Sequence, residues 1–395
     1  MAELFGHGPR TDRTARSFNE PMCAFMDRSG DPFFAGVRDL MAGWLGHVPS
    51  DHVADLRHRL QSKDGAQFES AFWELYLHEA YLRSGYRLTI HPALTGTRHR
   101  PDFLIEDGDT RFYLEAVGAC APAGRASENR RLEEARRILA EVGAERHLLD
   151  MATYQVGQRP LPVKALRRDL REWLSTLDVQ VDRRTAAAGG VIARRSWRHD
   201  GWRLEFTAQP LRSEHAGAGL PLVRGHLRMG WGHDASRILG ALNEKANRYG
   251  ALEAPLVIAV LSNSEFRTED IDVERALFGA LIGRRPGPEP PRPGQLLEPG
   301  HWCTKAGWRR AHIPQVIAIQ DLYPWTVTKA QPRLWATLEP GARAPAQPSW
   351  LARVQVSGAA PTPGPADSLA DLFDLPADWP PDEPHFVTRP RTATL

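Results

Sequence analysis

The sequence predicts an α/β protein, in which a central β-sheet is flanked by helices, with further helices before it and an arginine-rich hairpin inserted into it. Three observations predict this class. Apolar residues recur at helical spacing along 64–85, short β-type runs follow at 86–92, 101–107 and 111–118, and the uniformly apolar run VIAVL stands at 257–261. A strand of this last kind is typical of the middle of a sheet that helices cover on both faces.

The composition narrows the class of protein. A chain of 395 residues with 42% hydrophobic content can form one large or two ordinary domains. No run approaches the roughly 20 apolar residues of a membrane span, and the first residues lack the apolar core of a signal peptide, so we expect a cytoplasmic protein without membrane contact. Three scattered cysteines disfavour a disulfide framework and a structural zinc site.

Charge is less informative, because a formal net charge of +2 is common among ordinary enzymes. Nearly all cationic residues are arginines, for which a coding bias is the simplest cause. The few lysines leave few candidates for chemistry that requires an ammonium group.

The elements follow one another in a readable order. Residues 1–63 form an N-terminal part, with an irregular arm to residue 32. Residues 64–340 form the main domain, with an insertion at about 180–232, and 341–395 form a proline-rich, partly disordered tail. Expected helices lie at 33–45, 52–60, 64–85, 125–143, 164–177, 234–249 and 271–283, and further strands at 145–156, 255–264 and, as the last strand, 315–322. The insertion contains a hairpin, WRHDGWRLEF, with an Asp-Gly turn.

Two acidic positions carry the functional hypothesis. Pro101-Asp102 opens the first strand of a hairpin, and Glu115-Ala116-Val117 lies in its second strand. Together with the preceding helix, this order resembles the PD-(D/E)XK nuclease superfamily over residues 64–118 and 234–263. The resemblance implies a restriction-endonuclease-like fold with a mixed sheet, and Mg²⁺ (or Mn²⁺) held by Asp102, Glu115 and the carbonyl of Ala116.

The sequence departs from that pattern at Val117, where the superfamily has lysine. Strand alternation puts Tyr113, Glu115 and Val117 on one face, so a cation at 117 would lie beside the bound phosphate. Either the site is inactive or the cation comes from another element.

Lys245 is the candidate for that cation. It falls on the apolar stripe of the helix 234–249, where a lysine is out of place. The run Lys245-Ala246-Asn247-Arg248-Tyr249 resembles the QxxxY element of RecB-type nucleases, with lysine in place of glutamine. We therefore predict that Lys245 supplies the missing ammonium group and that Lys245→Met lowers turnover with little loss of stability. The alternative is a lysine that lies along the core and extends to water.

Glu74 is the candidate for a third acid, because it lies on the flank of the 64–85 helix, four residues before His78. A solvated glutamate is the alternative, and Glu69 is the fallback.

Candidates for nucleic-acid contact are arginines near the acidic pair and in the insertion. Guanidinium groups with interleaved tryptophans suit phosphates and stacked bases, whereas a solvated hairpin with two core tryptophans is the alternative. The candidates are Arg98, Arg100, Arg194, Arg195, Arg198 and Tyr249, and Trp197 and Trp202 lie in the same segment as the last three arginines.

These observations favour a metal-dependent nuclease that cleaves DNA. The alternative is a restriction-endonuclease-like domain without catalysis that serves as a nucleic-acid or protein-binding scaffold. The sequence does not decide whether identical chains form an oligomer, or whether the nucleic acid is DNA or RNA. The sequence contains no P-loop, no GxSxG and no CxxC pair, which disfavours an NTPase, a serine hydrolase or a zinc finger.

Overall fold

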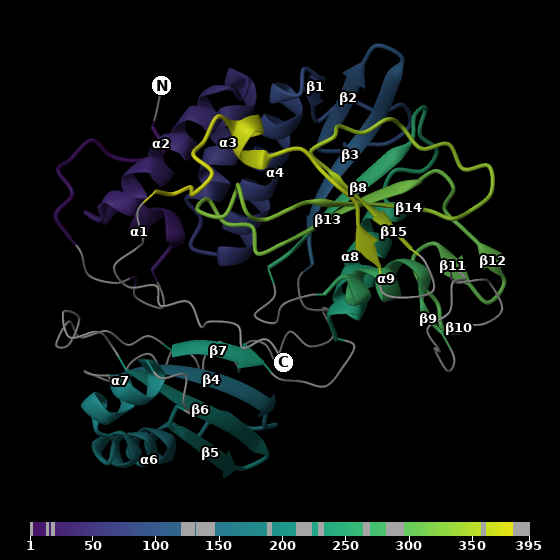
Figure 1. Cartoon of the computed structure of the whole chain (residues 1–395). Helices are drawn as coiled ribbons and strands as arrows, with labels where there is room; N and C mark the ends of the chain where they lie inside the picture. Colours follow the sequence, from purple (N-terminus) through teal and green to yellow (C-terminus); the bar gives the residue numbers. More distant parts are fainter. Residues whose placement is uncertain are drawn as a thin grey trace. The chain divides into compact units, whose positions relative to one another are not determined.

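The computed structural model describes two compact units, which we treat separately (Figure 1). The described residues are 3–12, 16, 20–119, 131, 147–187, 192–210, 223–227, 233–263, 269–281, 296–356 and 361–381.

The larger unit is an α/β structure built on a mixed eight-stranded sheet, as the sequence predicts for the fold class. Pairs β3–β8, β8–β13 and β14–β15 are parallel, and the other neighbouring pairs are antiparallel. In spatial order the strands are β1 (Arg87–Ile90), β2 (Phe103–Asp107), β3 (Thr110–Gly118), β8 (Leu256–Ser262), β13 (Gln315–Gln320), β14 (Arg333–Ala336), β15 (Ala352–Gln355) and β16 (Thr362–Pro363).

Helices flank this sheet, and most lie where the sequence predicts them. Asp64 caps the long helix by accepting a hydrogen bond from the amide of Ala66 (2.9 Å), and Gly85 ends it with a φ of +85°. The helices are α2 (Pro32–Gly46), α3 (Ser50–Leu60), α4 (Gly65–Arg83), α8 (His233–Ala246), α9 (Asp270–Phe278) and the short α10 (Leu369–Phe373). The helix expected at 125–143 lies almost entirely outside the described residues.

Helices α4 and α8 cover opposite faces of β3. The ring of Tyr81, on α4, packs 6.0 Å from that of Phe112, whereas Lys245, on α8, reaches Glu115. Positions 112 and 115 are an odd number of residues apart in one strand and therefore point to opposite faces. The apolar residues Val117, Ile238 and Leu242 share the α8 face.

Four expectations are wrong. The arm contains helix α1 (Met22–Arg28), in which Phe25 and Met26 are buried. Gly279, at φ +88°, ends α9 five residues early, at Phe278, because the next residues form β9 (Ala280–Leu281), which pairs with β10 (Leu296–Glu298). A small hairpin, β11 (Cys303–Thr304) with β12 (Gly307–Trp308), follows. The strand expected at 315–322 is β13, and it is not the last strand, because β14, β15 and β16 follow it.

The fourth correction concerns the proline-rich tail, whose described part packs into the core. Trp350 is buried against the ring of Tyr81 (5.5 Å) and donates to Ser84 Oγ (2.9 Å). Phe373 packs 4.8 Å from Trp44. The high proline content suggested an extended or disordered tail, although a few large apolar residues attach this segment to the core. Residues from 382 on lie outside the described part.

The second unit contains helix α1 and a four-stranded sheet with two further helices. Its strand order is β5 (Arg194–His199), β6 (Trp202–Pro210), β4 (His147–Gln155) and β7 (Val223–Leu227), and the helices are α6 (Val163–Ser175) and α7 (Val179–Ala187). The Asp-Gly turn of the expected hairpin is present, with φ of +44° and +79° at positions 200 and 201. The unit begins before the insertion predicted at 180–232, because β4 and α6 share an apolar core with the hairpin.

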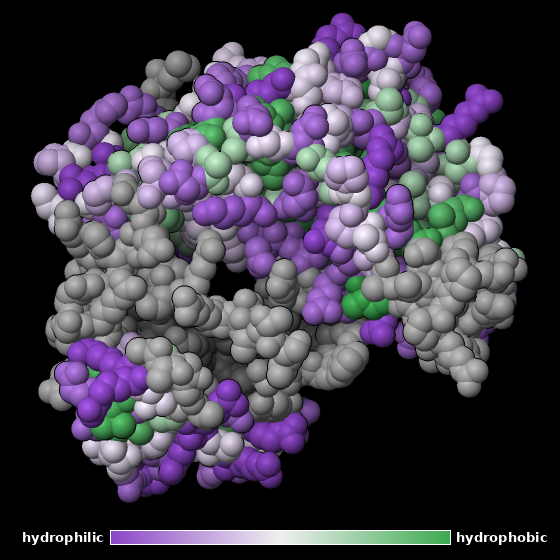
Figure 2. Space-filling model, in the orientation of Figure 1, coloured by the Kyte–Doolittle hydropathy of each residue, from purple (hydrophilic) through white to green (hydrophobic). Residues whose placement is uncertain are grey.

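No helix in the described part of the chain has the length and apolar character of a membrane span. On the face shown in Figure 2, hydrophilic residues predominate among those described, and apolar residues appear only in small groups.

Candidate functional site

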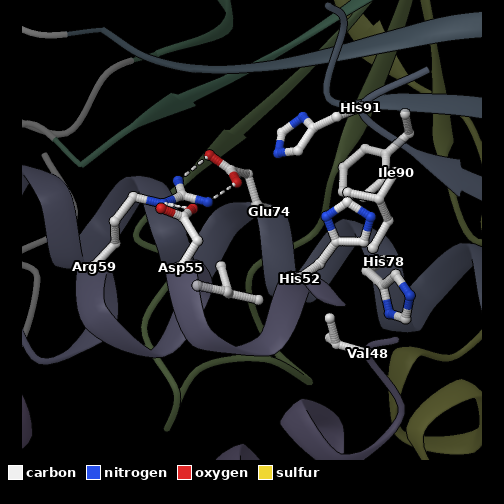
Figure 3. A pocket seen from close by; sticks show the side chains of 10 residues that line it. Val48, His52, Asp55, Arg59, Glu74, His78, Ile90 and His91 are labelled. Carbon is white, nitrogen blue, oxygen red and sulfur yellow. Dashed lines mark hydrogen bonds and ion pairs between the residues drawn. The ribbon is translucent and has the colours of Figure 1, made fainter. Parts of the chain in front are cut away.

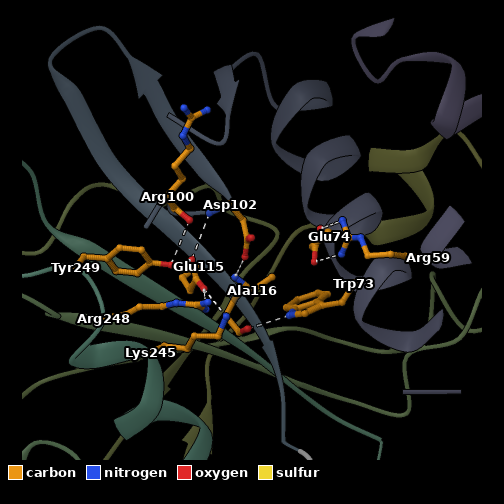
Figure 4. Close-up of polar contacts among 11 residues, drawn as sticks. Arg59, Trp73, Glu74, Arg100, Asp102, Glu115, Ala116, Lys245, Arg248 and Tyr249 are labelled. Atoms are coloured by element: carbon orange, nitrogen blue, oxygen red, sulfur yellow. Dashed lines mark hydrogen bonds and ion pairs between the residues drawn. The ribbon is translucent and has the colours of Figure 1, made fainter. Parts of the chain in front are cut away.

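Asp102 and Glu115 lie side by side because the β2–β3 hairpin places them there. The register pairs Phe103 with Leu114, so the residue before β2 meets the residue after Leu114. The amide of Asp102 donates to Glu115 Oε2 (3.3 Å), and the amide of Ala116 donates to Asp102 Oδ2 (2.7 Å) (Figure 4). These two bonds fix both carboxylates at the end of the hairpin.

Helix α8 brings a cation to this pair. Lys245 Nζ lies 2.5 Å from Glu115 Oε1, and the Tyr249 hydroxyl donates to Glu115 Oε2 at 2.5 Å (Figure 4). Arg248 Nη1 is 4.0 Å from Glu115 Oε1. The Glu115 side chain is only 1% exposed, and that of Lys245 is 15% exposed. The placement predicted for Lys245, beside Glu115, is thus confirmed, and the alternative of a lysine that extends to water is not what the structure has.

The local backbone differs from the expectation in one respect. Helix α8 ends at Ala246 instead of continuing to 249, and a turn follows in which the amide of Arg248 donates to the carbonyl of Lys245 (3.2 Å). Tyr249 therefore reaches Glu115 from a turn closed by Gly250, at φ +67°, and not from the next turn of the helix. Lys245 and Tyr249 consequently hold different oxygens of the same carboxylate.

Val117 explains why the cation cannot come from the strand. Its side chain is buried in an apolar cluster with Ile238 and Leu242 of α8 and Val260 of β8. Tyr113 belongs to the same cluster, so the predicted alternation of 113, 115 and 117 onto one face is confirmed. The cation beside Glu115 therefore comes from helix α8 and not from strand β3.

Glu74 lies on α4 near the acidic pair but is already engaged. Both its oxygens accept hydrogen bonds from the guanidinium of Arg59 at 2.6 Å, and Arg59 Nε donates to Asp55 Oδ2 (2.9 Å). The Glu74 side chain is 12% exposed, so it is not the freely solvated glutamate of the alternative hypothesis. Glu79, on the same helix, is bound by His47 and Arg83 and plays no part in the pair.

Carboxylates lie close together in the site, and this affects the pKa of Asp102. Removal from water raises the pKa of Asp102 well above its usual range, and the neighbouring charges of Glu115 and Glu74 raise it further. The ammonium of Lys245 and the amide of Ala116 act in the opposite direction. Burial and the charge of Glu115 likewise raise the pKa of Tyr249, so its hydroxyl keeps its proton and donates.

The donor set fits a divalent ion in part. Asp102 and Glu115 offer hard carboxylate oxygens, and the raised pKa of Asp102 reflects negative charge that a cation would relieve. Glu74 does not join them unless Arg59 releases it. Accordingly, among the residues described, no three His, Cys, Asp or Glu side chains are arranged to hold a metal.

The arginines proposed for nucleic-acid contact fall into two groups. Arg98 and Arg100 are exposed in the loop before Asp102, and the Arg100 carbonyl accepts a long bond from Tyr249 (3.4 Å). Arg194, Arg195 and Arg198 are exposed on the β5–β6 hairpin of the second unit.

The tryptophans interleaved with those hairpin arginines are structural, as the alternative hypothesis held. Trp197 donates to Asp169 Oδ2 (3.1 Å) and Trp202 to the carbonyl of Arg159 (3.0 Å), and both rings are buried with α6. Stacking of bases on these rings is excluded, because no face is open to a ligand.

Sequence reasoning missed two residues of the site, Arg59 and Arg248. Arg248 stands within the quoted run 245–249, so its proximity to a lysine that faces the site was a usable signal. Arg59 had none, because its contact with Glu74 depends on how α3 packs against α4. Comparisons with protein-family models, with curated proteins and with solved structures gave no match.

Proposed function

We propose that the chain is a metal-dependent nuclease of the PD-(D/E)XK type that hydrolyses DNA phosphodiester bonds. The observation that carries this proposal is the ammonium of Lys245, 2.5 Å from the carboxylate of Glu115, whose side chain is 1% exposed. A purely structural role gives little reason to bury a lysine, an aspartate and a glutamate together, because the desolvation of such charges is costly.

The arrangement of elements supports a restriction-endonuclease-like fold for the core. Helix α4 precedes the antiparallel strands β1, β2 and β3, and β8 joins β3 in parallel after α8. The acids lie at the start of β2 and within β3, and the cation comes from the helix that leads into β8.

Each residue then has a defined task. Asp102 and Glu115 would hold Mg²⁺ or Mn²⁺, with the Ala116 carbonyl as a further donor; when bound, the ion neutralises phosphate charge and activates water. Lys245 orients the attacking water and offsets negative charge that develops on the phosphate. Tyr249 holds Glu115 in place through its hydroxyl. Arg98 and Arg100, exposed beside Asp102, contact the DNA backbone.

A second function, that of an inactive scaffold, is favoured because the carboxylates of the site already have hydrogen-bond and ion-pair partners within the chain. Lys245, Arg248, Tyr249 and the Asp102 amide already surround Glu115, and Arg59 occupies Glu74. In such a domain these contacts would stabilise the fold, and the protein would bind nucleic acid or another protein without cleaving it.

Cleavage assays separate the two functions. Purified protein is incubated with plasmid and linear DNA, with Mg²⁺, with Mn²⁺ and with chelator. We expect cleavage with either metal, none with chelator, and none from Asp102→Ala or Glu115→Ala. Asp109→Ala, an exposed carboxylate in the turn of the same hairpin, is the matched control and should stay active. Cleavage that survives the chelator, or an active Asp102→Ala protein, would remove the metal-site assignment.

A further inference from the structure

A pocket opens beside the acidic pair, between α3, α4 and the β1–β2 edge of the sheet (Figure 3). It adjoins the site through two residues. Glu74 lines it, and the amide of His91, which also lines it, donates to the carbonyl of Asp102 (2.9 Å). His91 holds a left-handed φ of +47°, which is uncommon for a residue with a side chain. The pocket is thus attached to the backbone of a proposed metal ligand.

The walls of the pocket are apolar and aromatic. Val48, Leu56, Ile90 and Phe103 supply apolar surface. The rings of His52 and His91 meet at 5.6 Å and 68°, and both are labelled in Figure 3 beside the cavity. Surfaces of this composition suit a flat ring that can lie against them.

The polar end of the pocket disfavours an anion. Arg59 is the one guanidinium among the lining residues, and it is shared between two carboxylates, Glu74 and Asp55. These three groups carry a net charge of −1, so a phosphate there would be repelled. Carboxylate oxygens instead accept hydrogen bonds from amino groups.

A buried, uncharged imidazole also belongs to the wall of the pocket. His78 lines the pocket and is 4% exposed, and its Nδ1 has no hydrogen-bond partner among the described residues. Burial lowers the pKa of His78, so the ring is neutral and has one donor and one acceptor nitrogen. Because Nδ1 is itself buried, His78 adds a flat, neutral face to the wall and no polar contact to a ligand.

We propose that this pocket binds a nucleobase that carries an exocyclic amino group, namely that of a nucleotide next to the phosphate cleaved at Asp102 and Glu115. The inference rests on the proposed nuclease function, which it sharpens. A base inside a duplex cannot enter the pocket, so the substrate presents an unpaired base, in a single strand or turned out of the helix.

Free nucleosides test the pocket without involving the metal site, because they carry no phosphate. Binding of deoxycytidine and of thymidine to the full-length protein is measured in EDTA by saturation-transfer NMR and calorimetry. We expect deoxycytidine to bind about tenfold more tightly, because thymine lacks the amino group that the carboxylates accept. His52→Ala, which removes a ring from the wall, should weaken deoxycytidine binding about tenfold, the loss typical of one base-stacking contact.

Two further variants make the test specific. Ile90→Trp fills the pocket and should abolish nucleoside binding. His58→Ala removes an exposed histidine of α3 that is not among the lining residues, and it should bind as wild type does. Thermal melts of each variant confirm that the protein is folded before its binding is compared.

The outcomes separate this inference from the proposed function. Equal binding of the two nucleosides, undetectable binding, or wild-type affinity in Ile90→Trp would overturn the pocket assignment while cleavage by wild type still supports the nuclease. Selective nucleoside binding by a protein that cleaves no DNA would instead refute the nuclease and leave the base pocket standing.

Discussion

Replacing Lys245 by methionine tests the site most directly, because methionine keeps most of the packing volume and removes the charge. Glu115, with its side chain 1% exposed, then loses its closest cation and keeps the Tyr249 hydroxyl at 2.5 Å and Arg248 at 4.0 Å. Breaking a buried ion pair costs about 3–5 kcal/mol of stability. Because other donors to Glu115 remain in this variant, we expect a cost at the lower end of that range, about 3 kcal/mol. From the structure we therefore expect Lys245→Met to destabilise the protein, whereas the sequence predicted little loss of stability.

Turnover should fall by about 10²–10³, the loss typical of one preorganised electrostatic contact in a closed site. Urea unfolding gives the free energy of unfolding, and single-turnover cleavage of plasmid DNA gives the rate. Lys63→Met, an exposed lysine just before α4, is the matched control and should change neither quantity.

The double variant Glu115→Gln with Lys245→Met separates stability from catalysis. Removal of both charges should recover about 2 kcal/mol of the stability lost in the single variant, because no uncompensated charge stays buried, yet cleavage should stay absent. Wild-type stability in Lys245→Met would contradict the buried contact, and wild-type turnover would contradict the catalytic role and favour the scaffold.

Other perturbations give independent checks. The raised pKa of Asp102 means that the folded state binds a proton more tightly than the unfolded chain, so the ionised carboxylate destabilises the fold above that pKa and the penalty disappears in acid. Thermal melts should therefore show Asp102→Asn more stable than wild type at a pH above the raised pKa of Asp102, with the gap narrowing as the pH falls through that pKa, although the variant cleaves no DNA. Tyr249→Phe should keep the fold and lower turnover, because Glu115 loses one of the donors that orient it. Trp202→Ala should destabilise the second unit by about 3–5 kcal/mol in denaturant titrations. Arg198→Ala, at an exposed position, should stay within about 0.5 kcal/mol of wild type in the same titrations and weaken DNA binding in anisotropy measurements.

The sequence by itself determined the elements that depend on local pattern. Local patterns of apolar residues identified the helix α4, the β2–β3 hairpin and the buried strand β8, because the burial of each element is visible in residues close together in sequence. The sequence also indicated that Lys245 lies on a buried stripe, and this position, together with the resemblance of 245–249 to a QxxxY element, predicted its contact with Glu115 across 130 positions.

Tertiary structure decided the contacts that no local pattern records. Arg59 binds Glu74 because α3 packs against α4, and Trp350 binds α4 although it lies in a proline-rich segment. The sequence left the tryptophans of the hairpin open as stacking surfaces or as core residues, and only their packing on α6 distinguished the two. Side chains distant in sequence compete for the same partners, so the pairing of each charge depends on the whole arrangement, whereas helical and strand periodicity depends only on which face is buried.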